Sequence, residues 1–88
     1  LPPKIFSKLS SLKTLLLNKN LIKTLSSDSF YGLESNLETL DLGSNRLSYL
    51  NGSISKLKRL RALNLSNNYL INLNLIHSDI ELFEKLTL

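Results

Sequence analysis

The chain contains no cysteine, no methionine and no tryptophan, and it has only two prolines and three glycines among its 88 residues. Without cysteine it has neither a disulfide nor a thiolate ligand for a metal ion. Its apolar runs are far shorter than the ~20 residues that a membrane-spanning helix needs, and no segment has the charged, apolar and small-residue order of a signal peptide. The glycines stand singly, so the chain lacks a glycine-rich loop for binding phosphate.

Charge and histidine content argue against further classes of function. Eleven basic and seven acidic residues give a net charge of +4, which is too small an excess to predict nucleic-acid binding. The basic run KLKRLR at residues 56–61 is interrupted by Leu57 and Leu60, and it contains no aromatic residue that could stack on bases. His77 is the only histidine, and no second metal ligand or nucleophile stands at a recognisable spacing from it. We therefore expect no nucleic acid, no metal, no cofactor and no enzymatic activity.

The most informative feature is a leucine pattern that recurs three times. LKTLLLNKNLI begins at Leu12, LETLDLGSNRL at Leu37 and LRALNLSNNYL at Leu60, and all three fit L-x-x-L-x-L-x-x-N-x-[LI]. The copies are 25 and 23 residues apart, and a further step of 23 residues reaches FEKLTL at Phe83. Because the asparagine keeps its phase with the leucines in all three complete copies, chance leucine richness does not explain the pattern.

The pattern divides the whole chain into repeat units. Residues 1–11 form the end of a preceding repeat, residues 12–36, 37–59 and 60–82 form three repeats, and residues 83–88 begin the next one. Since the pattern runs to both ends, we expect the 88 residues to be a segment of a longer protein.

Within each copy, the spacing predicts one short strand followed by a bend. Leu40, Asp41 and Leu42 alternate as in a half-buried strand, and Gly43 with Ser44 has the composition of a turn. The asparagine after the bend can satisfy backbone groups that the bend leaves unpaired. Stacked one per repeat, these residues are predicted to form a structural asparagine ladder of Asn20, Asn45 and Asn68.

These motifs make the chain resemble the leucine-rich repeat family along essentially all of its length. The resemblance implies an α/β repeat fold: a right-handed, horseshoe-shaped solenoid with a short parallel sheet on its concave face and looser return segments on its convex face. Two return segments carry a phenylalanine, Phe6 in LPPKIFSKL and Phe30 in LSSDSFYGL. This is similar to the longer repeats of Toll-like and other animal extracellular receptors, whose convex side holds a phenylalanine spine. The third segment departs from them, with Ile54 at that place.

Candidate binding residues follow from the strand alternation, because positions between the inward leucines face outward. One column of these residues alternates in sign, namely Lys13, Glu38, Arg61 and Glu84, and its members can pair between neighbouring strands. The face lacks the aromatic anchors that are common at interface hot spots. The residues predicted to contact a protein partner on the concave face are Lys13, Asn18, Lys19, Glu38, Asp41, Arg61 and Asn64.

The resemblance implies a protein-recognition module. The first hypothesis is part of a receptor or adhesion ectodomain that binds a protein ligand through the concave face. The alternatives are an intracellular scaffold or regulatory subunit, and a repeat segment adjoining a kinase or phosphatase domain. Two N-x-[ST] sequons, NGS at Asn51 and NLS at Asn64, are candidate glycosylation sites. Asn51 is the better one because it is expected on an accessible turn beyond the bend, whereas a glycan at Asn64 would cover part of the concave face. We therefore expect an extracellular or membrane-anchored location, with a cytoplasmic one as the alternative, and no membrane contact within this segment.

Overall fold

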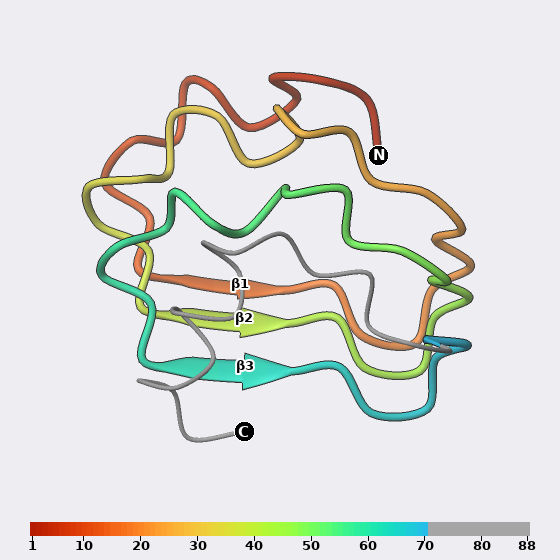
Figure 1. The fold of residues 1–88 in the computed structure, drawn as a ribbon. Helices are drawn as coiled ribbons and strands as arrows, with labels where there is room; N and C mark the ends of the chain where they lie inside the picture. The colour runs from red at the N-terminus through yellow and green to blue at the C-terminus, as the bar shows by residue number, and fades with distance from the viewer. Residues whose placement is uncertain (71–88) are drawn as a thin grey trace.

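Three short strands, one from each leucine motif, form the centre of the computed structural model, which describes residues 1–70. They are β1 (Thr14–Leu16), β2 (Thr39–Asp41) and β3 (Ala62–Asn64). The strands make one parallel sheet in the order β1-β2-β3 (Figure 1). After each of the first two strands the chain bends and returns by a long segment to the start of the next strand, as parallel pairing requires. The predicted short parallel sheet is therefore confirmed.

The register of the sheet places equivalent residues of neighbouring motifs side by side. The central leucines Leu15, Leu40 and Leu63 pair with one another. Leu40 is 1% exposed and Leu63 is 3% exposed, so they lie on the inner side of the sheet. Because successive strand residues face opposite sides, the other two residues of each strand stand on the outer side.

Each strand is followed by a bend that needs a left-handed backbone. Lys19, Ser44 and Asn67 have φ angles of 58°, 56° and 57°, and each directly precedes an asparagine of the predicted ladder. Backbone hydrogen bonds connect the neighbouring bends: the Lys19 N–H donates to the Gly43 carbonyl oxygen at 2.9 Å, and the Ser44 N–H donates to that of Ser66 at 2.8 Å. The bends therefore share one conformation and stack in register.

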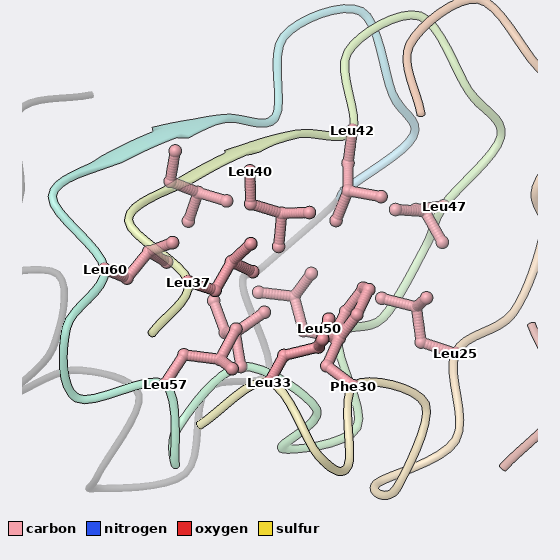
Figure 2. Close-up of a cluster of buried hydrophobic side chains, with 12 residues drawn as sticks. Leu25, Phe30, Leu33, Leu37, Leu40, Leu42, Leu47, Leu50, Leu57 and Leu60 are labelled. Carbon is pink, nitrogen blue, oxygen red and sulfur yellow. The ribbon is translucent and has the colours of Figure 1, made fainter. Parts of the chain in front are cut away.

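Leucine side chains from the strands and the return segments fill the space between them (Figure 2). In Figure 2, Leu40 and Leu42 on the strand side face Leu33 and Phe30 on the return side. The buried core consists of Leu25, Phe30, Leu33, Leu37, Leu40, Leu42, Leu47, Leu50, Ile54, Leu57, Leu60 and Leu63. These residues come from successive turns of the chain, so the core depends on neighbouring repeats packing together.

The return segments are built from turns, so the helical part of the predicted α/β class is absent from the described residues. In the second segment the N–H groups of Ser29, Tyr31 and Leu33 each donate to the carbonyl oxygen three residues earlier, at 3.1 Å. A helix would need i→i−4 bonds repeated over several turns. Gly32 interrupts that path with a φ of 99°, and the side-chain oxygens of Ser26 and Ser29 accept backbone N–H groups instead.

The two phenylalanines of the return segments stack on one another. The ring centroids of Phe6 and Phe30 are 6.2 Å apart, and the ring planes differ by 4°. Phe30 is 2% exposed, whereas Phe6 is half-buried. Ile54, at the corresponding place in the third segment, is fully buried. An apolar side chain therefore fills this place in successive turns, and its size is smaller in the third.

Gly32 packs against the preceding return segment in a conformation that excludes a side chain. A Cβ at this position would lie 2.7 Å from the carbonyl oxygen of Ser7, and φ is 99°. We expect Gly32→Ala to lower the free energy of unfolding by about 1 to 3 kcal/mol, because strain at positive φ adds to that contact. Urea unfolding followed by circular dichroism measures the change. Gly52→Ala is the control, since its φ of 68° lies near the left-handed region that other residues visit. Equal losses in both variants would contradict a role for the Ser7 contact.

Residues 71–88 lie outside the described part of the chain. They include the end of the predicted repeat 60–82, the predicted start of the next repeat at 83–88, and His77. Within residues 1–70, no helix has the length and hydrophobicity that a membrane span requires.

Candidate functional site

The outer side of the sheet carries two columns of side chains. The register aligns the outward residues of the three strands as Thr14, Thr39 and Ala62, and as Leu16, Asp41 and Asn64. The outward residues of β1 and β3 are exposed, and those of β2 are half-buried between them. Leu16 is 63% exposed, so one edge of this face is apolar and the rest is mainly polar.

A third column lies directly before the strands and consists of Lys13, Glu38 and Arg61. The Glu38 N–H donates to the Lys13 carbonyl oxygen at 2.8 Å, and the Arg61 N–H donates to the Glu38 carbonyl oxygen at 2.7 Å. The Arg61 guanidinium and the Glu38 carboxylate lie 3.8 Å apart, with side chains 81% and 39% exposed. A solvated ion pair of this kind contributes little to stability. Both charged groups therefore remain available to a partner.

Asp41 and Asn64 use part of their hydrogen-bonding capacity to shape the bends after their strands. Asp41 Oδ1 accepts the Gly43 N–H at 2.9 Å, and Asn64 Oδ1 accepts the N–H of Ser66 at 2.9 Å and its hydroxyl at 2.7 Å. Gly43 lies under Asn64, since a Cβ on Gly43 would be 2.7 Å from Asn64 Nδ2. These bonds hold the two side chains in place, so they present fixed groups to a partner.

Asn18 and Lys19 lie in the bend after β1, and both are exposed. The structure thus places the seven predicted contact residues on or beside the outer side of the sheet. They lie before the strands (Lys13, Glu38, Arg61), within them (Asp41, Asn64) and after β1 (Asn18, Lys19). Within residues 1–70, no three His, Cys, Asp or Glu side chains are grouped so that they could hold a metal ion.

Asn45 connects two consecutive turns of the chain through its side chain. Its Nδ2 donates to the Leu17 carbonyl oxygen of the preceding turn at 3.0 Å, and to those of Leu42 and Gly43 in its own turn at 2.9 and 3.2 Å. Its Oδ1 accepts the Ile22 N–H of the preceding turn at 3.2 Å. Asn45 is 5% exposed, so these bonds satisfy groups that water reaches poorly.

Asn68 repeats this arrangement one turn later. Its Nδ2 donates to the carbonyl oxygens of Leu42 and Leu65 at 2.9 and 3.1 Å, and its Oδ1 accepts the Leu47 N–H at 3.0 Å. Asn20 is exposed, and its Nδ2 donates to two carbonyl oxygens of its own bend at 2.9 and 3.2 Å. Within the described residues, Asn45 and Asn68 therefore bond across turns and Asn20 bonds within one turn.

A second set of side-chain bonds joins the turns on the return side, and the sequence did not predict it. Ser29 Oγ donates to the Leu1 carbonyl oxygen at 2.9 Å, and Asn51 Nδ2 donates to that of Leu25 at 2.7 Å. Leu1 and Leu25 occupy the same place in consecutive repeats, so each carbonyl is bound by the following turn. The two donors differ in residue type and in position, which leaves no periodic signal to find. Asn51 is exposed, but the nitrogen that would carry a glycan makes this bond.

Ser29 and Ser53 directly precede the aligned apolar residues of their return segments but differ in their partners. Ser29 Oγ bonds to two backbone groups, whereas the buried Ser53 Oγ has no hydrogen-bond partner within residues 1–70. We expect Ser29→Ala to lower the free energy of unfolding by about 1 to 3 kcal/mol. Ser53→Ala should leave it unchanged or raise it by up to about 1 kcal/mol, because a buried, unpaired hydroxyl is removed. Urea unfolding of both variants, made without glycans, measures this. Equal losses would show that the Ser29 bonds do not stabilise the fold.

The geometry is that of a repeat protein in which each turn of the chain contributes one strand to a parallel sheet. The chain belongs to the leucine-rich repeat family, because the family model described as leucine rich repeat matches residues 1–35 and 34–70. It is similar to the probable inactive serine/threonine-protein kinase roco10 of Dictyostelium discoideum, with 42% identity over 74 residues, which are 81% of this chain and 3% of that protein. It is also similar to leucine-rich repeat-containing protein 3B of Danio rerio, with 45% identity over 47 residues, which are 53% of this chain and 18% of that protein. No solved structure matches the chain. The chain thus spans a small part of both relatives.

Proposed function

We propose that the chain is a protein-recognition module of a leucine-rich repeat receptor or adhesion ectodomain, and that it binds a protein ligand through the outer side of its sheet. In this proposal the turns form a right-handed solenoid with a horseshoe arc, and the outer side of the sheet is its concave face. Solenoid proteins commonly bind partners through such extended surfaces.

The observation that carries this proposal is the alignment of three outward columns on a fixed backbone. The cross-turn bonds of Asn45 and Asn68 hold the bends directly beside the strands. A backbone that is already ordered loses less entropy on binding. The face also combines the exposed Leu16 with charged groups of both signs, Glu38 and Arg61 among them. Mixed chemistry of this kind suits a protein surface better than a polyanion.

Two observations support an extracellular receptor or adhesion protein of the Toll-like type. The Phe6 and Phe30 rings stack between consecutive return segments, as expected for a phenylalanine-bearing convex side. The sequons at Asn51 and Asn64 lie on exposed residues. An extracellular or membrane-anchored location is accordingly part of the proposal.

A cytoplasmic scaffold or regulatory subunit is the alternative, together with a repeat segment beside a kinase or phosphatase domain. The similarity to the probable inactive kinase of Dictyostelium discoideum, which covers 81% of this chain at 42% identity, supports the second of these, a repeat segment beside a kinase domain. In both proposals the repeats recognise a protein, and we assign no catalytic step to them.

Site-specific crosslinking in the intact protein tests the sheet face as the binding surface. A photoreactive residue at Thr39, in the central column of the outer side, is expected to crosslink to a partner protein in cells that express the protein naturally. The same group at Ser27, an exposed residue of a return segment, is the control. Crosslinks of equal yield from both positions, or from Ser27 alone, would reject the sheet face.

The intact mass of the protein from its native source, before and after enzymatic removal of N-glycans, separates the two locations. We expect a loss of glycan mass that maps to Asn51, because a glycan at Asn64 would cover the proposed binding face. Ser53→Ala is the control, because it removes the NGS sequon but keeps the hydrogen bond from Asn51 to Leu25, so glycan mass at Asn51 should be absent from this variant. An unchanged mass would favour the cytoplasmic alternative.

A further inference from the structure

The residue after each ladder asparagine forms an exposed row along one edge of the repeats. Leu21 is 70% exposed, Tyr69 is 60% exposed, and Arg46 between them is also exposed. The Arg46 N–H donates to the Ile22 carbonyl oxygen at 2.9 Å, and the Tyr69 N–H donates to the Leu47 carbonyl oxygen at 2.8 Å. Neighbouring turns are therefore in backbone contact at this edge, which lies at the right of Figure 1. We call Leu21, Arg46 and Tyr69 the edge row.

The backbone beside the edge row is hydrogen-bonded between turns. The residue after Leu21 donates its N–H to Asn45 Oδ1 at 3.2 Å, and the residue after Arg46 donates its N–H to Asn68 Oδ1 at 3.0 Å. Ile22 and Leu47, which follow the first two members of the row, are thus each bound to the next turn through both the N–H and the carbonyl oxygen. Side chains on a fixed backbone bind with a smaller loss of entropy than side chains on a mobile loop.

The side chains of the edge row have no structural task within residues 1–70. The salt bridge of the described residues joins Arg61 to Glu38, and the cation–π contact joins Lys4 to Tyr31. None of the side-chain hydrogen bonds in that region involves the edge row either. Large side chains that are exposed and aligned, yet do not stabilise the fold, are candidates for contact with another molecule.

Charge distinguishes this edge from the face of the sheet. The bends and following segments at residues 17–24, 42–49 and 65–70 contain Lys19, Lys23 and Arg46 but no aspartate or glutamate. Next to the strands, in contrast, the carboxylates of Glu38 and Asp41 offset the basic residues. The edge therefore combines cationic and apolar groups and offers no carboxylate to a cationic partner.

We propose that the edge row is a second contact surface, which binds an acidic protein segment carrying apolar side chains. Arg46 pairs with a carboxylate of the partner, and Leu21 and Tyr69 on either side pack against its apolar groups. Arginine and tyrosine are enriched among residues that dominate interface energies, and the planar guanidinium binds carboxylates with two parallel hydrogen bonds. The inference rests on the proposed function in that the repeats recognise proteins, but it uses a different surface.

Binding of short synthetic peptides to the intact protein tests this surface. The probe alternates Asp or Glu with Phe or Leu, and two matched peptides replace either the apolar residues by Ser or the acidic residues by Lys. We expect only the first to bind, more weakly at high salt because the charges are exposed. Arg46→Glu should raise its Kd at least about tenfold, and Tyr69→Ala about tenfold. Arg59→Glu makes the same charge reversal at an exposed residue outside both surfaces, so it is the matched control and should change the Kd by less than about twofold.

Each other outcome has a defined meaning. Failure of the probe to bind, or equal binding to Arg46→Glu, overturns the edge row as a surface for acidic segments. Binding to phosphatidylserine vesicles without binding to the peptide would identify a membrane contact instead. Peptide binding that is lost in Arg61→Glu but kept in Arg46→Glu would assign it to the sheet face. Peptide binding at the edge together with no crosslink from Thr39 would reject the sheet face and keep the edge row.

Discussion

Phe30→Ala is expected to lower the free energy of unfolding by about 3 to 5 kcal/mol, the range for removing a large buried aromatic side chain. Phe30 is 2% exposed and packs among leucines from the strand side and the return side. Its ring also stacks on Phe6 at 6.2 Å, a contact between consecutive turns. Truncation therefore opens a cavity and removes a link between repeats at once. Urea unfolding monitored by circular dichroism, with the change in midpoint converted by the slope, measures the loss.

Two controls separate cavity formation from the stacking of the rings. Phe30→Leu keeps most of the apolar volume but removes the ring stack. It should lower the free energy of unfolding by less than about 1.5 kcal/mol beyond the loss of the stack itself. Phe6→Ala removes the same stack from the half-buried side, so we expect a loss of only about 1 to 2 kcal/mol. If Phe6→Ala destabilised as much as Phe30→Ala, stacking and not burial would be the main contribution.

The sheet and its core were predictable from the sequence because both follow from one repeated motif. Leu40 and Leu63 keep the same place in their motifs, and the register pairs them directly. Strand alternation then determines which neighbours face outward, which is why the columns through Thr14 and Asp41 could be listed in advance. Periodicity carries this information, and it is strong wherever every turn uses the same residue type.

Features that change from turn to turn were less accessible to sequence reasoning. The return segments differ in length, and their serines and glycines favour turns over the helix that an α/β class implies. Ser29 and Asn51 bind equivalent carbonyl oxygens from different positions, so neither could be found by aligning the repeats. Sequence reasoning treated Asn51 as a glycan acceptor, and its bond to Leu25 depends on a backbone φ of 56° that the motif does not encode.

The candidate surfaces show the same division. Outward positions of the strands were known from alternation, but the edge row follows the ladder asparagines, where leucine, arginine and tyrosine share no pattern. The edge row can be recognised only from the structure, which shows that its side chains are exposed and that neighbouring turns are hydrogen-bonded beside it. The same asparagines that satisfy the bends also fix the backbone of the edge row. Stability and presentation of a surface therefore depend on one set of hydrogen bonds.

Asn45→Ala is the substitution that should expose this dependence, with an expected loss of about 2 to 3 kcal/mol in the free energy of unfolding. The substitution removes the partner of the Ile22 N–H and one donor from each of three carbonyl oxygens, at a residue that is 5% exposed. Unsatisfied buried groups cost about 1 to 3 kcal/mol. Asn20→Ala is the matched control. Asn20 is exposed and bonds within its own bend, so its loss should be below about 1 kcal/mol.

Asn45→Asp identifies which half of the amide matters. The carboxylate keeps an oxygen for the Ile22 N–H but has no donor for the carbonyl oxygens of Leu17 and Leu42. We expect Asn45→Asp to destabilise the fold at least as much as Asn45→Ala, because an anion then faces buried carbonyl groups.

The rate of amide hydrogen exchange at Ile22 should rise in Asn45→Ala and stay closer to the original rate in Asn20→Ala. If Asn45→Ala and Asn20→Ala lost the same stability and the same protection from exchange, the bonds between turns would stabilise the fold no more than those within a single bend.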